Sequence, residues 1–321
     1  MPKQKAITLA PDALDRNGLS TTETLLATRL DYLINGAFAV SGSYDVDAIV
    51  ASAIPVAGTA MTILDHNFED RKGAYILIDS DGSGDETGGT FVIVGKEHGT
   101  GNAITETITG PDADLIVLGT TRFASVTSVT PAGTLSGNTV TVGVNGYATF
   151  STPQHMSTYH AADDSGETVT FLGEDRYDET LSETITGGGL GATVDTTQNF
   201  KRVDRITASG AGAGATEAGN DGLCESQWYV LNYRGNNFSV GLGLDIVSGT
   251  LTCAVQHTFN NVQGKGFREG DATVHTHDTI TGKTADFDGN YSNPPVACRL
   301  AITAFTSGSA TLRIVQSGSG T

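Results

Sequence analysis

Two glutamates occupy equivalent places in a strand that the sequence writes twice. The stretch NAITETITG carries Glu106, and the later stretch ETLSETITG carries Glu183. Two carboxylates facing each other across a sugar would form the acid and nucleophile pair of a glycosidase, but equivalent positions in separate repeat copies do not normally converge to that distance. We therefore predict no catalytic role. We interpret each glutamate as an inward-leaning charge near a sheet edge, with Arg122 or Arg202 as the expected basic neighbour.

An acidic loop, DSDGSGDE, could wrap oxygen ligands around a calcium ion. It presents Asp79, Asp81, Asp85 and Glu86 around two glycines. The loop lacks the EF-hand pattern with its terminal glutamate. Ordinary turn chemistry explains the same residues, so a solvated acidic hairpin turn is our preferred interpretation.

A histidine pair in the stretch TVHTHDT could bind a transition metal. His275 and His277 are two residues apart, which places them on the same face of an extended strand. A trimer could bring three such pairs together on its axis. Two ligands from one chain do not complete a site, so we favour a satisfied or exposed histidine pair and predict no metal site.

The three cysteines, Cys224, Cys253 and Cys298, form an odd set without short spacing. This pattern suggests neither a disulfide framework nor a zinc site. We predict reduced thiols, with Cys253 and Cys298 buried in apolar strands. A disulfide between these two residues remains the alternative.

The sequence contains none of the common catalytic or nucleotide-binding patterns. It has no G-x-S-x-G elbow, no P-loop, no H-E-x-x-H, and no G-x-G-x-x-G that follows a strand and opens a helix. The stretch GGGLG lies in a Thr-rich loop without a Lys-Ser or Lys-Thr partner. We therefore expect no enzymatic activity, no catalytic residues and no cofactor.

The elements that position these residues are expected to be short β-strands. The chain has 41 glycines in 321 residues and 17% charged residues, and its apolar residues occur largely in short runs. This profile is typical of strands joined by turns. The formal net charge of -18 opposes binding to nucleic acid phosphates. No apolar run has the length of a signal peptide or a bilayer span, so we expect a protein made inside a cell and bound to no membrane.

An internal repeat organises the middle of the chain. Glu106 and Glu183 are 77 residues apart, and the same offset matches Val92 with Val169, Phe123 with Phe200, Val126 with Val203, and Thr130 with Thr207. Each copy reads as a strand, a turn, the ETITG strand, a loop and a strand that begins at phenylalanine. This order predicts antiparallel β-sandwich modules. The second copy lacks the TVTVGV strand, which leaves its last strands undetermined.

We predict an all-β fold of tandem β-sandwich modules, immunoglobulin-like or jelly-roll-like, behind an N-terminal extended arm. The predicted units are the arm at 1–20, a first module with N-terminal strands at 21–150, a second repeat at 151–225 and a C-terminal sandwich at 226–321. The arm has no strong apolar period, so alone it should be mobile and should order on a neighbour's surface.

Three further local predictions concern an N-terminal stretch and the C-terminal module. The stretch LSTTETLLATRLDYLINGAFAV reads as strands around an Asn-Gly turn, with a helix as the alternative. In the C-terminal module, a Ser-Gly pair at 248–249 is interpreted as a turn between two strands. Trp228 is expected to be a core plug, because its ring is large and apolar.

The repeated motifs resemble a module of virion structural proteins of tailed bacteriophages, especially phages of aquatic bacteria. The motifs are NAITETITGP followed by FASVTSVT, and LSETITGG followed by FKRVDRIT. The C-terminal runs look like the β-sandwich that such proteins often carry at their ends, so the resemblance covers roughly 70–318. It implies a particle component without catalytic residues.

This resemblance favours a capsid decoration or cement protein, made in the host cytoplasm and located on the virion. Such a protein would adhere to its lattice through many weak contacts multiplied by symmetry. The expected partners are phage capsid or tail proteins and further copies of the chain, with a trimer favoured. A tail, collar or fibre component is the alternative. A host-glycan-binding adhesin is the alternative of another class, which the scattered aromatic residues disfavour.

Overall fold

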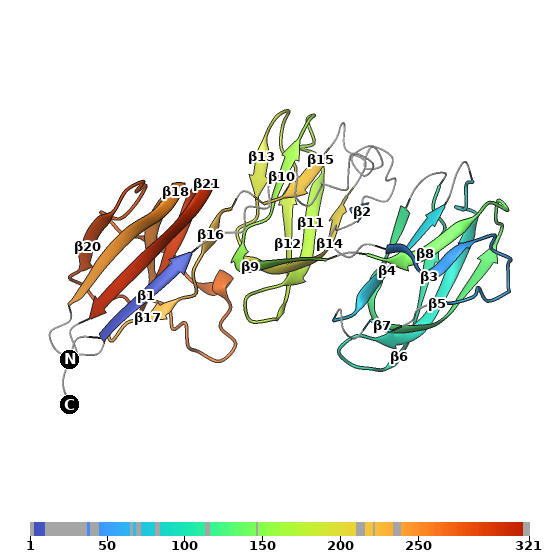
Figure 1. Cartoon of the computed structure of the whole chain (residues 1–321), viewed down its shortest axis with the longest axis horizontal. Helices are drawn as coiled ribbons and strands as arrows, with labels where there is room; N and C mark the ends of the chain where they lie inside the picture. Colours follow the sequence, from blue (N-terminus) through green and yellow to red (C-terminus); the bar gives the residue numbers. More distant parts are fainter. Residues whose placement is uncertain are drawn as a thin grey trace.

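The computed structural model describes residues 3–9, 37–38, 45–64, 67–68, 72–80, 84–112, 116–145, 147–209, 216–220, 222–233 and 239–316. Within this part of the chain, the elements are β-strands and one short 3-10 helix, so the predicted all-β fold is confirmed. Figure 1 shows three β units in a row, with the N and C ends of the chain together at one end. Most of the stretch for which a helix was the alternative lies outside the described residues.

The first unit, sandwich 1 (residues 45–145), is a six-stranded antiparallel sheet with its own core. The strand order is β3-β8-β4-β7-β5-β6. The long strand β7 pairs with β4 along its first half and with β5 along its second half, and the sheet bends over a core that includes Phe91 and Phe123. The strands are β3 (Asp45–Ala53), β4 (Ala74–Ser80), β5 (Gly89–Glu97), β6 (Ala103–Thr109), β7 (Ile116–Gly133) and β8 (Val140–Val144).

The second unit, sandwich 2 (residues 148–219 with 37–38), packs two antiparallel sheets around Phe171 and Phe200. One sheet has the order β13-β10-β15, and the other has the order β12-β11-β14-β2, with β9 also paired to β14. The strands are β2 (Ala37–Phe38), β9 (Ala148–Gln154), β10 (Ser157–His160), β11 (Thr168–Glu174), β12 (Thr180–Thr186), β13 (Thr193–Asp195), β14 (Phe200–Ala208) and β15 (Thr216–Gly219).

Sandwich 2 repeats the strand pairing of sandwich 1. The strands β10, β11 and β12 take the places of β4, β5 and β6, and β13 with β14 takes the place of β7. The predicted matches of Phe123 with Phe200 and of Val126 with Val203 are confirmed, because all four side chains are fully buried on equivalent strands. β15 pairs with β10 as β8 pairs with β4, so the second copy has a strand in the place of β8 although its sequence lacks the TVTVGV motif.

The predicted match of Val92 with Val169 is wrong by one residue. Val169 lies opposite Ile185, whereas the equivalent Ile108 lies opposite Phe91. Val169 therefore corresponds to Phe91. The offset changes within the repeat because the turn between these two strands is one residue shorter in the second copy.

The third unit, sandwich 3 (residues 3–9 and 224–316), is built on two long strands, β18 and β21, that pair along their whole length. Both halves of this pair line one core, which includes Leu242, Leu251, Leu300 and Leu312. The elements are β1 (Lys3–Leu9), β16 (Cys224–Glu225), β17 (Tyr229–Val230), β18 (Val240–Thr258), the 3-10 helix η3 (Glu269–Asp271), β19 (His275–Thr276), β20 (Phe287–Tyr291) and β21 (Ala297–Gln316).

The Ser-Gly pair predicted to be a turn is instead a bend inside this long pair. Gly249 lies opposite Gly308, with φ values of 80° and 107°, and the register shifts on either side. A Cβ on Gly308 would overlap the carbonyl oxygen of Ser248. Glycine on both strands therefore lets them bend together and close over a single core.

The N-terminal part of the chain visits all three units in reverse order. β1 pairs with β21 in sandwich 3, β2 pairs with β14 in sandwich 2, and β3 pairs with β8 in sandwich 1. Residues 3–9 of the predicted arm are thus an edge strand rather than a free segment, and the rest of the arm lies outside the described residues. β9 begins at Ala148 and β16 at Cys224, next to the boundaries that were predicted at 150 and 225.

Candidate functional site

The repeated glutamates accept the same hydrogen bonds in both copies. Glu106 Oε1 accepts from the backbone N–H of Thr120 at 2.5 Å and from its hydroxyl at 2.8 Å. Glu183 Oε1 accepts from the N–H of Thr197 at 2.6 Å and from its hydroxyl at 2.8 Å. In each copy the carboxylate also accepts from the next backbone N–H. The two glutamates lie in separate sandwiches, and the carboxylate of each accepts hydrogen bonds from its own sandwich.

The expected ion pairs of these glutamates are not formed. Arg122 pairs with Glu174 and Asp204, and Arg202 also pairs with Asp204. The prediction of a basic neighbour was wrong because the glutamates accept hydrogen bonds from backbone N–H groups instead. β7 passes from β4 to β5 through a register shift, and β13 and β14 are interrupted at the equivalent point, so backbone N–H groups there lack a ladder partner.

The acidic residues of this loop are divided between an exposed turn and the protein interior. Asp79 is buried in β4, whereas Asp85 is exposed and accepts hydrogen bonds from the backbone N–H and the hydroxyl of Thr87. These bonds lower the pKa of Asp85. Glu86 is fully buried and accepts a backbone N–H at 3.0 Å. Asp81 lies outside the described residues.

The predicted histidine pair is divided between the surface and the interior. His277 is buried, and its Nδ1 accepts backbone N–H groups while its Nε2 donates to the Asn290 carbonyl at 3.1 Å. His275 is exposed and lies opposite His257 on β18, with ring centroids 5.6 Å apart. Within the described parts of the chain, no three histidine, cysteine or acidic side chains gather as metal ligands.

The cysteines are free and buried, as the odd count predicted. Burial raises the pKa of Cys253 to about 12 and that of Cys298 to about 12, so neither thiol is a ready nucleophile at neutral pH. Trp228 is buried, but its ring lies under the Arg299 guanidinium at 4.5 Å rather than in the central core cluster.

The sharpest clustering of charge lies at the junction between sandwiches 1 and 2. Lys72 Nζ and Arg122 of sandwich 1 reach Glu174 of sandwich 2 at 3.0 and 3.4 Å. Arg122 also reaches Asp204 at 3.5 Å, next to Arg202. Burial raises the pKa of Asp204, although both arginines oppose this shift. A buried carboxylate shared by two arginines would be costly to leave unpaired, so these charges fix how the two sandwiches meet.

An apolar contact lies beside these charges. Tyr75, Leu77, Ile116 and Leu118 form a small buried cluster on β4 and β7, and Leu172 of β11 packs against it. The junction therefore combines buried apolar area with specific ion pairs, as a stable interface between domains does.

A second charged junction joins sandwiches 2 and 3 through Glu225. Its carboxylate lies 2.9 Å from His155 Nε2 and 3.6 Å from Arg299, and it accepts the Asn199 amide at 2.8 Å. Burial alone would raise the pKa of Glu225, but the His155 hydrogen bond and the nearby positive charges lower it to about 2. Burial likewise opposes the charged form of His155, yet Glu225 raises its pKa overall.

One turn of sandwich 2 contacts both neighbours. In the β11–β12 turn (residues 175–179), Asp178 pairs with Lys72 of sandwich 1 at 3.1 Å. Arg176 of the same turn lies 2.8 Å from Glu269 of sandwich 3. Asp178 and Lys72 are the non-glycine residues with positive φ in the described chain. The turn thus links the three units.

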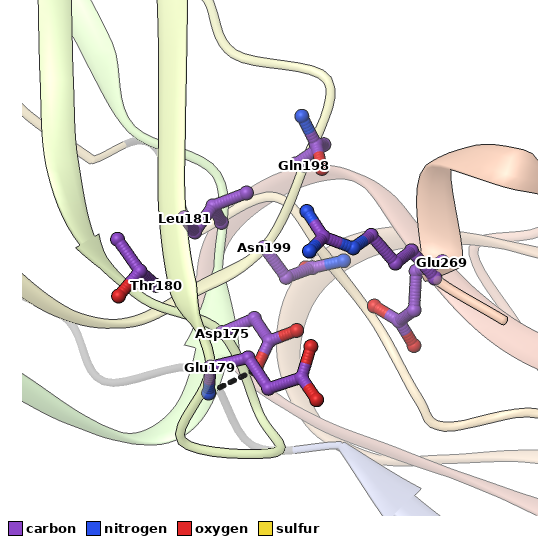
Figure 2. A pocket seen from close by; sticks show the side chains of 8 residues that line it. Asp175, Glu179, Thr180, Leu181, Gln198, Asn199 and Glu269 are labelled. Carbon is purple, nitrogen blue, oxygen red and sulfur yellow. Dashed lines mark hydrogen bonds between the residues drawn. The ribbon is translucent and has the colours of Figure 1, made fainter. Parts of the chain in front are cut away.

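A shallow cavity of about 30 Å³ lies where this turn meets sandwich 3. Figure 2 shows the carboxylates of Asp175 and Glu179 on one side of it and Glu269 on the other. Asp175 also accepts the Glu179 backbone N–H at 3.0 Å, which fixes the turn. Sites for small organic ligands usually enclose about 300–1,000 Å³, so this cavity suits a water molecule and marks the seam between two units. It is lined by Asp175, Glu179, Thr180, Leu181, Gln198, Asn199, Arg268 and Glu269.

The sequence singled out Arg122 and Arg202 as partners of Glu106 and Glu183, but it did not indicate their junction partners Glu174 and Asp204. Arg202 and Asp204 flank Val203, which lies in the core of sandwich 2, so the two charged side chains are on the other face of β14, and both are buried. Both residues stand in the stretch FKRVDRIT, but the partner Arg122 comes from the other repeat copy. Only the contact between the sandwiches reveals the pair.

Comparison with known proteins gives no relative from which a function could be transferred. The chain matches no protein-family model, no curated protein and no solved structure. Among the described residues, no helix has the length and apolar character needed to cross a membrane.

Proposed function

We propose that this chain is a non-enzymatic structural protein of a tailed-bacteriophage virion, and that it decorates and stabilises the capsid surface. The observation that carries the proposal is the row of three β-sandwiches joined by paired charges and a turn that contacts both neighbours. A row held in this way suits a spacer or brace. The phage-like ETITG motifs, which occupy β6 and β12, support the same class.

In this proposal, the residues whose side chains could have been catalytic all stabilise the fold. Glu106 and Glu183 accept hydrogen bonds from backbone N–H groups, and Glu225 joins two sandwiches. The cysteines are buried thiols whose pKa is raised by burial, which makes them unreactive. The cavity at the junction has the size of a water molecule. Adhesion through an extended surface needs no pocket and no nucleophile.

The particle-facing end is assigned to sandwich 3. β1 carries Lys3 and Lys5, and it is held at the edge of this sandwich by pairing with β21. A basic strand contrasts with the net charge of -18 of the whole chain. In this arrangement sandwich 3 contacts capsid or tail proteins, sandwich 1 points outward, and a trimer would multiply weak contacts.

The abundance of the chain in purified virions tests this proposal. Quantitative mass spectrometry should find hundreds of copies per particle, comparable with the shell protein. A dozen copies or fewer would instead assign the protein to the tail, collar or fibre. Absence from purified particles would overturn the virion assignment.

A glycan-binding adhesin is tested separately, because it would require exposed aromatic side chains lining a groove. Within the part of the chain that the structure describes, the most exposed aromatic side chains, Tyr177 and Phe259, lie in different sandwiches. The proposal predicts no binding of the purified protein to a host-glycan array. Specific binding that is lost in Phe259→Ala would support the adhesin instead.

A further inference from the structure

An exposed apolar segment follows β3 in sandwich 1. This tip segment (residues 54–64, IPVAGTAMTIL) carries Ile54, Val56 and Leu64, whose exposed fractions are 60%, 59% and 61%. These residues are among the most exposed large apolar side chains in the described chain. In Figure 1 the blue chain after β3 lies at the end of the row away from the two termini.

The tip segment belongs to an uncharged surface on an otherwise acidic protein. Residues 48–64 contain no Asp, Glu, Lys or Arg, and neither do residues 123–138. The two runs are neighbours in space, because Gly58 N donates to the Pro131 carbonyl at 2.7 Å and Met61 N donates to the Val129 carbonyl at 2.9 Å. Two uncharged runs therefore lie side by side on a chain whose formal net charge is -18.

The backbone of the tip segment is already fixed. Besides its bonds to β7, Leu64 N donates to the Ile49 carbonyl at 2.7 Å, and Met61 and Ile63 pack against the core of sandwich 1. The alternate side chains of the segment are thereby held outward. The ordering cost of a contact through this surface is small, because the segment does not have to fold when a partner binds.

The tip segment covers one side of β7. It lies along β7 on the side away from β5, where an edge of backbone groups would otherwise face water. A covering segment is one of the usual ways to protect such an edge, so the backbone of β7 needs no further partner. What faces solvent instead is the set of outward apolar side chains on the tip segment, and an exposed apolar surface of this kind indicates an interaction site.

We propose that the tip segment is a self-association surface, and that its occupant is the same segment of a second copy of this chain. Two molecules of net charge -18 repel each other, and they can approach most closely through the surface that carries no charge. A symmetric contact brings identical patches together, which an apolar patch tolerates and an acidic patch does not. Copies anchored side by side through sandwich 3 would also present their tips to one another. Only this last step depends on the proposed function.

The contact is expected to be weak in solution. The exposed apolar patch is on the order of a few hundred Å², the size of the largest patch on a typical monomer. Stable interfaces bury about 800 Å² on each partner. Association should therefore depend on concentration, and it should increase with salt because salt screens the repulsion between acidic bodies.

Sedimentation equilibrium of the purified full-length protein tests the inference. We expect the weight-average mass to rise above the monomer mass of 33.2 kDa as the protein concentration and the salt concentration increase. The variant Ile54→Glu/Val56→Glu/Leu64→Glu should remain monomeric under the same conditions. Val247→Glu is the matched control, since Val247 is 60% exposed but lies in sandwich 3, and this variant should associate like the wild type.

Three results would overturn the inference. One is a wild-type protein that stays monomeric at all concentrations and salt levels. Another is association that persists unchanged in the triple variant, which would place the contact elsewhere. The third is a monomeric protein whose triple variant fails to enter virions, because the tip would then contact a different virion protein. The sedimentation result is independent of whether the chain occurs in virions, so the failure of one proposal is distinguishable from the failure of the other.

Discussion

Glu106 and Glu183 solve the same backbone problem in two sandwiches. A strand that passes from one neighbour to another leaves two adjacent N–H groups without ladder partners, and each carboxylate accepts both of them. The carboxylate can therefore lie between apolar neighbours, because its oxygens accept hydrogen bonds. This explains why the repeated strand carries a charge on its inward side.

Replacing either glutamate by glutamine should destabilise only its own sandwich. Glutamine keeps one acceptor oxygen but turns an amide toward the other N–H, so we expect a loss of about 1 kcal/mol in each case. Hydrogen exchange followed by mass spectrometry should show faster exchange at 116–123 in Glu106→Gln and at 193–199 in Glu183→Gln. Glu179→Gln, on an exposed turn, is the control. Unchanged exchange in both variants would show that the bonds are dispensable.

The junction between His155 and Glu225 should make stability depend on pH. The raised pKa of His155 contributes stability that is complete below its ordinary value of 6.5 and is lost as pH rises through the raised value. The lowered pKa of Glu225 contributes stability that is complete above its ordinary value of 4.5 and is lost as pH falls toward 2. The pair therefore contributes most between pH 4.5 and 6.5.

The melting temperature measured from pH 5 to pH 9 checks this dependence. In the wild type we expect the contribution of the junction to decline as pH rises above 6.5 and through the raised pKa of His155. His155→Gln should lower stability most near pH 5 to 6 and should flatten that decline. A variant with the same pH profile as the wild type would show that His155 does not carry a proton at the junction.

At the scale of elements, two long paired strands form the frame of sandwich 3. β18 and β21 continue through their bend because Gly249 and Gly308 lie opposite each other with positive φ. The bend lets both halves of the pair line one core. Any side chain at this point would separate the strands.

Gly308→Ala should therefore destabilise sandwich 3 strongly. The added Cβ meets the Ser248 carbonyl and requires an unfavourable φ of 107°, so we expect a loss of at least about 2 kcal/mol. Gly282→Ala is the control, because Gly282 also has positive φ but nothing lies near its Cβ position, and it should cost about 1 kcal/mol. Calorimetry should resolve the two. Equal effects would mean that the bend does not depend on close contact.

The strand β1 also belongs to the frame of sandwich 3. A mobile arm could be removed by deletion of residues 2–18 with little effect on unfolding, but residues 3–9 pair with β21 over seven positions. The deletion should therefore lower the melting temperature and expose the amides of 310–316 to exchange. If exchange at 310–316 does not change, β1 does not occupy this edge.

Much of the fold could be predicted from the sequence, and the features that could not be predicted have physical causes. The ETITG echo and the buried positions of β7 and β14 predicted the repeat, because local alternation and spacing survive duplication. The one-residue change in the turn shifted the match of Val169, since spacing alone does not define a strand's partner. The pairing of β1 with β21 joins opposite ends of the sequence and leaves no local signal. For the candidate site, the odd number of cysteines and their lack of short spacing predicted free thiols, whereas the charged junctions depend on contacts between sandwiches.

At the scale of the whole molecule, the chain contributes strands to the three sandwiches in one direction and then builds them in the opposite direction. The N-terminal strands pass from sandwich 3 through sandwich 2 to sandwich 1, and the remaining chain then builds the three units in the opposite direction. Each neighbouring pair is crossed by the chain and fixed by ion pairs. The result is one extended body with its two terminal strands in one unit and its uncharged tip at the far end.

The most direct test of this account is a cryo-electron microscopy difference map between virions that contain the protein and virions that lack it. We expect elongated density on the capsid surface, into which the three-sandwich row fits with sandwich 3 against the shell and sandwich 1 outward. Particles without any difference density, or density in which sandwich 1 faces the shell, would contradict the proposed role and orientation.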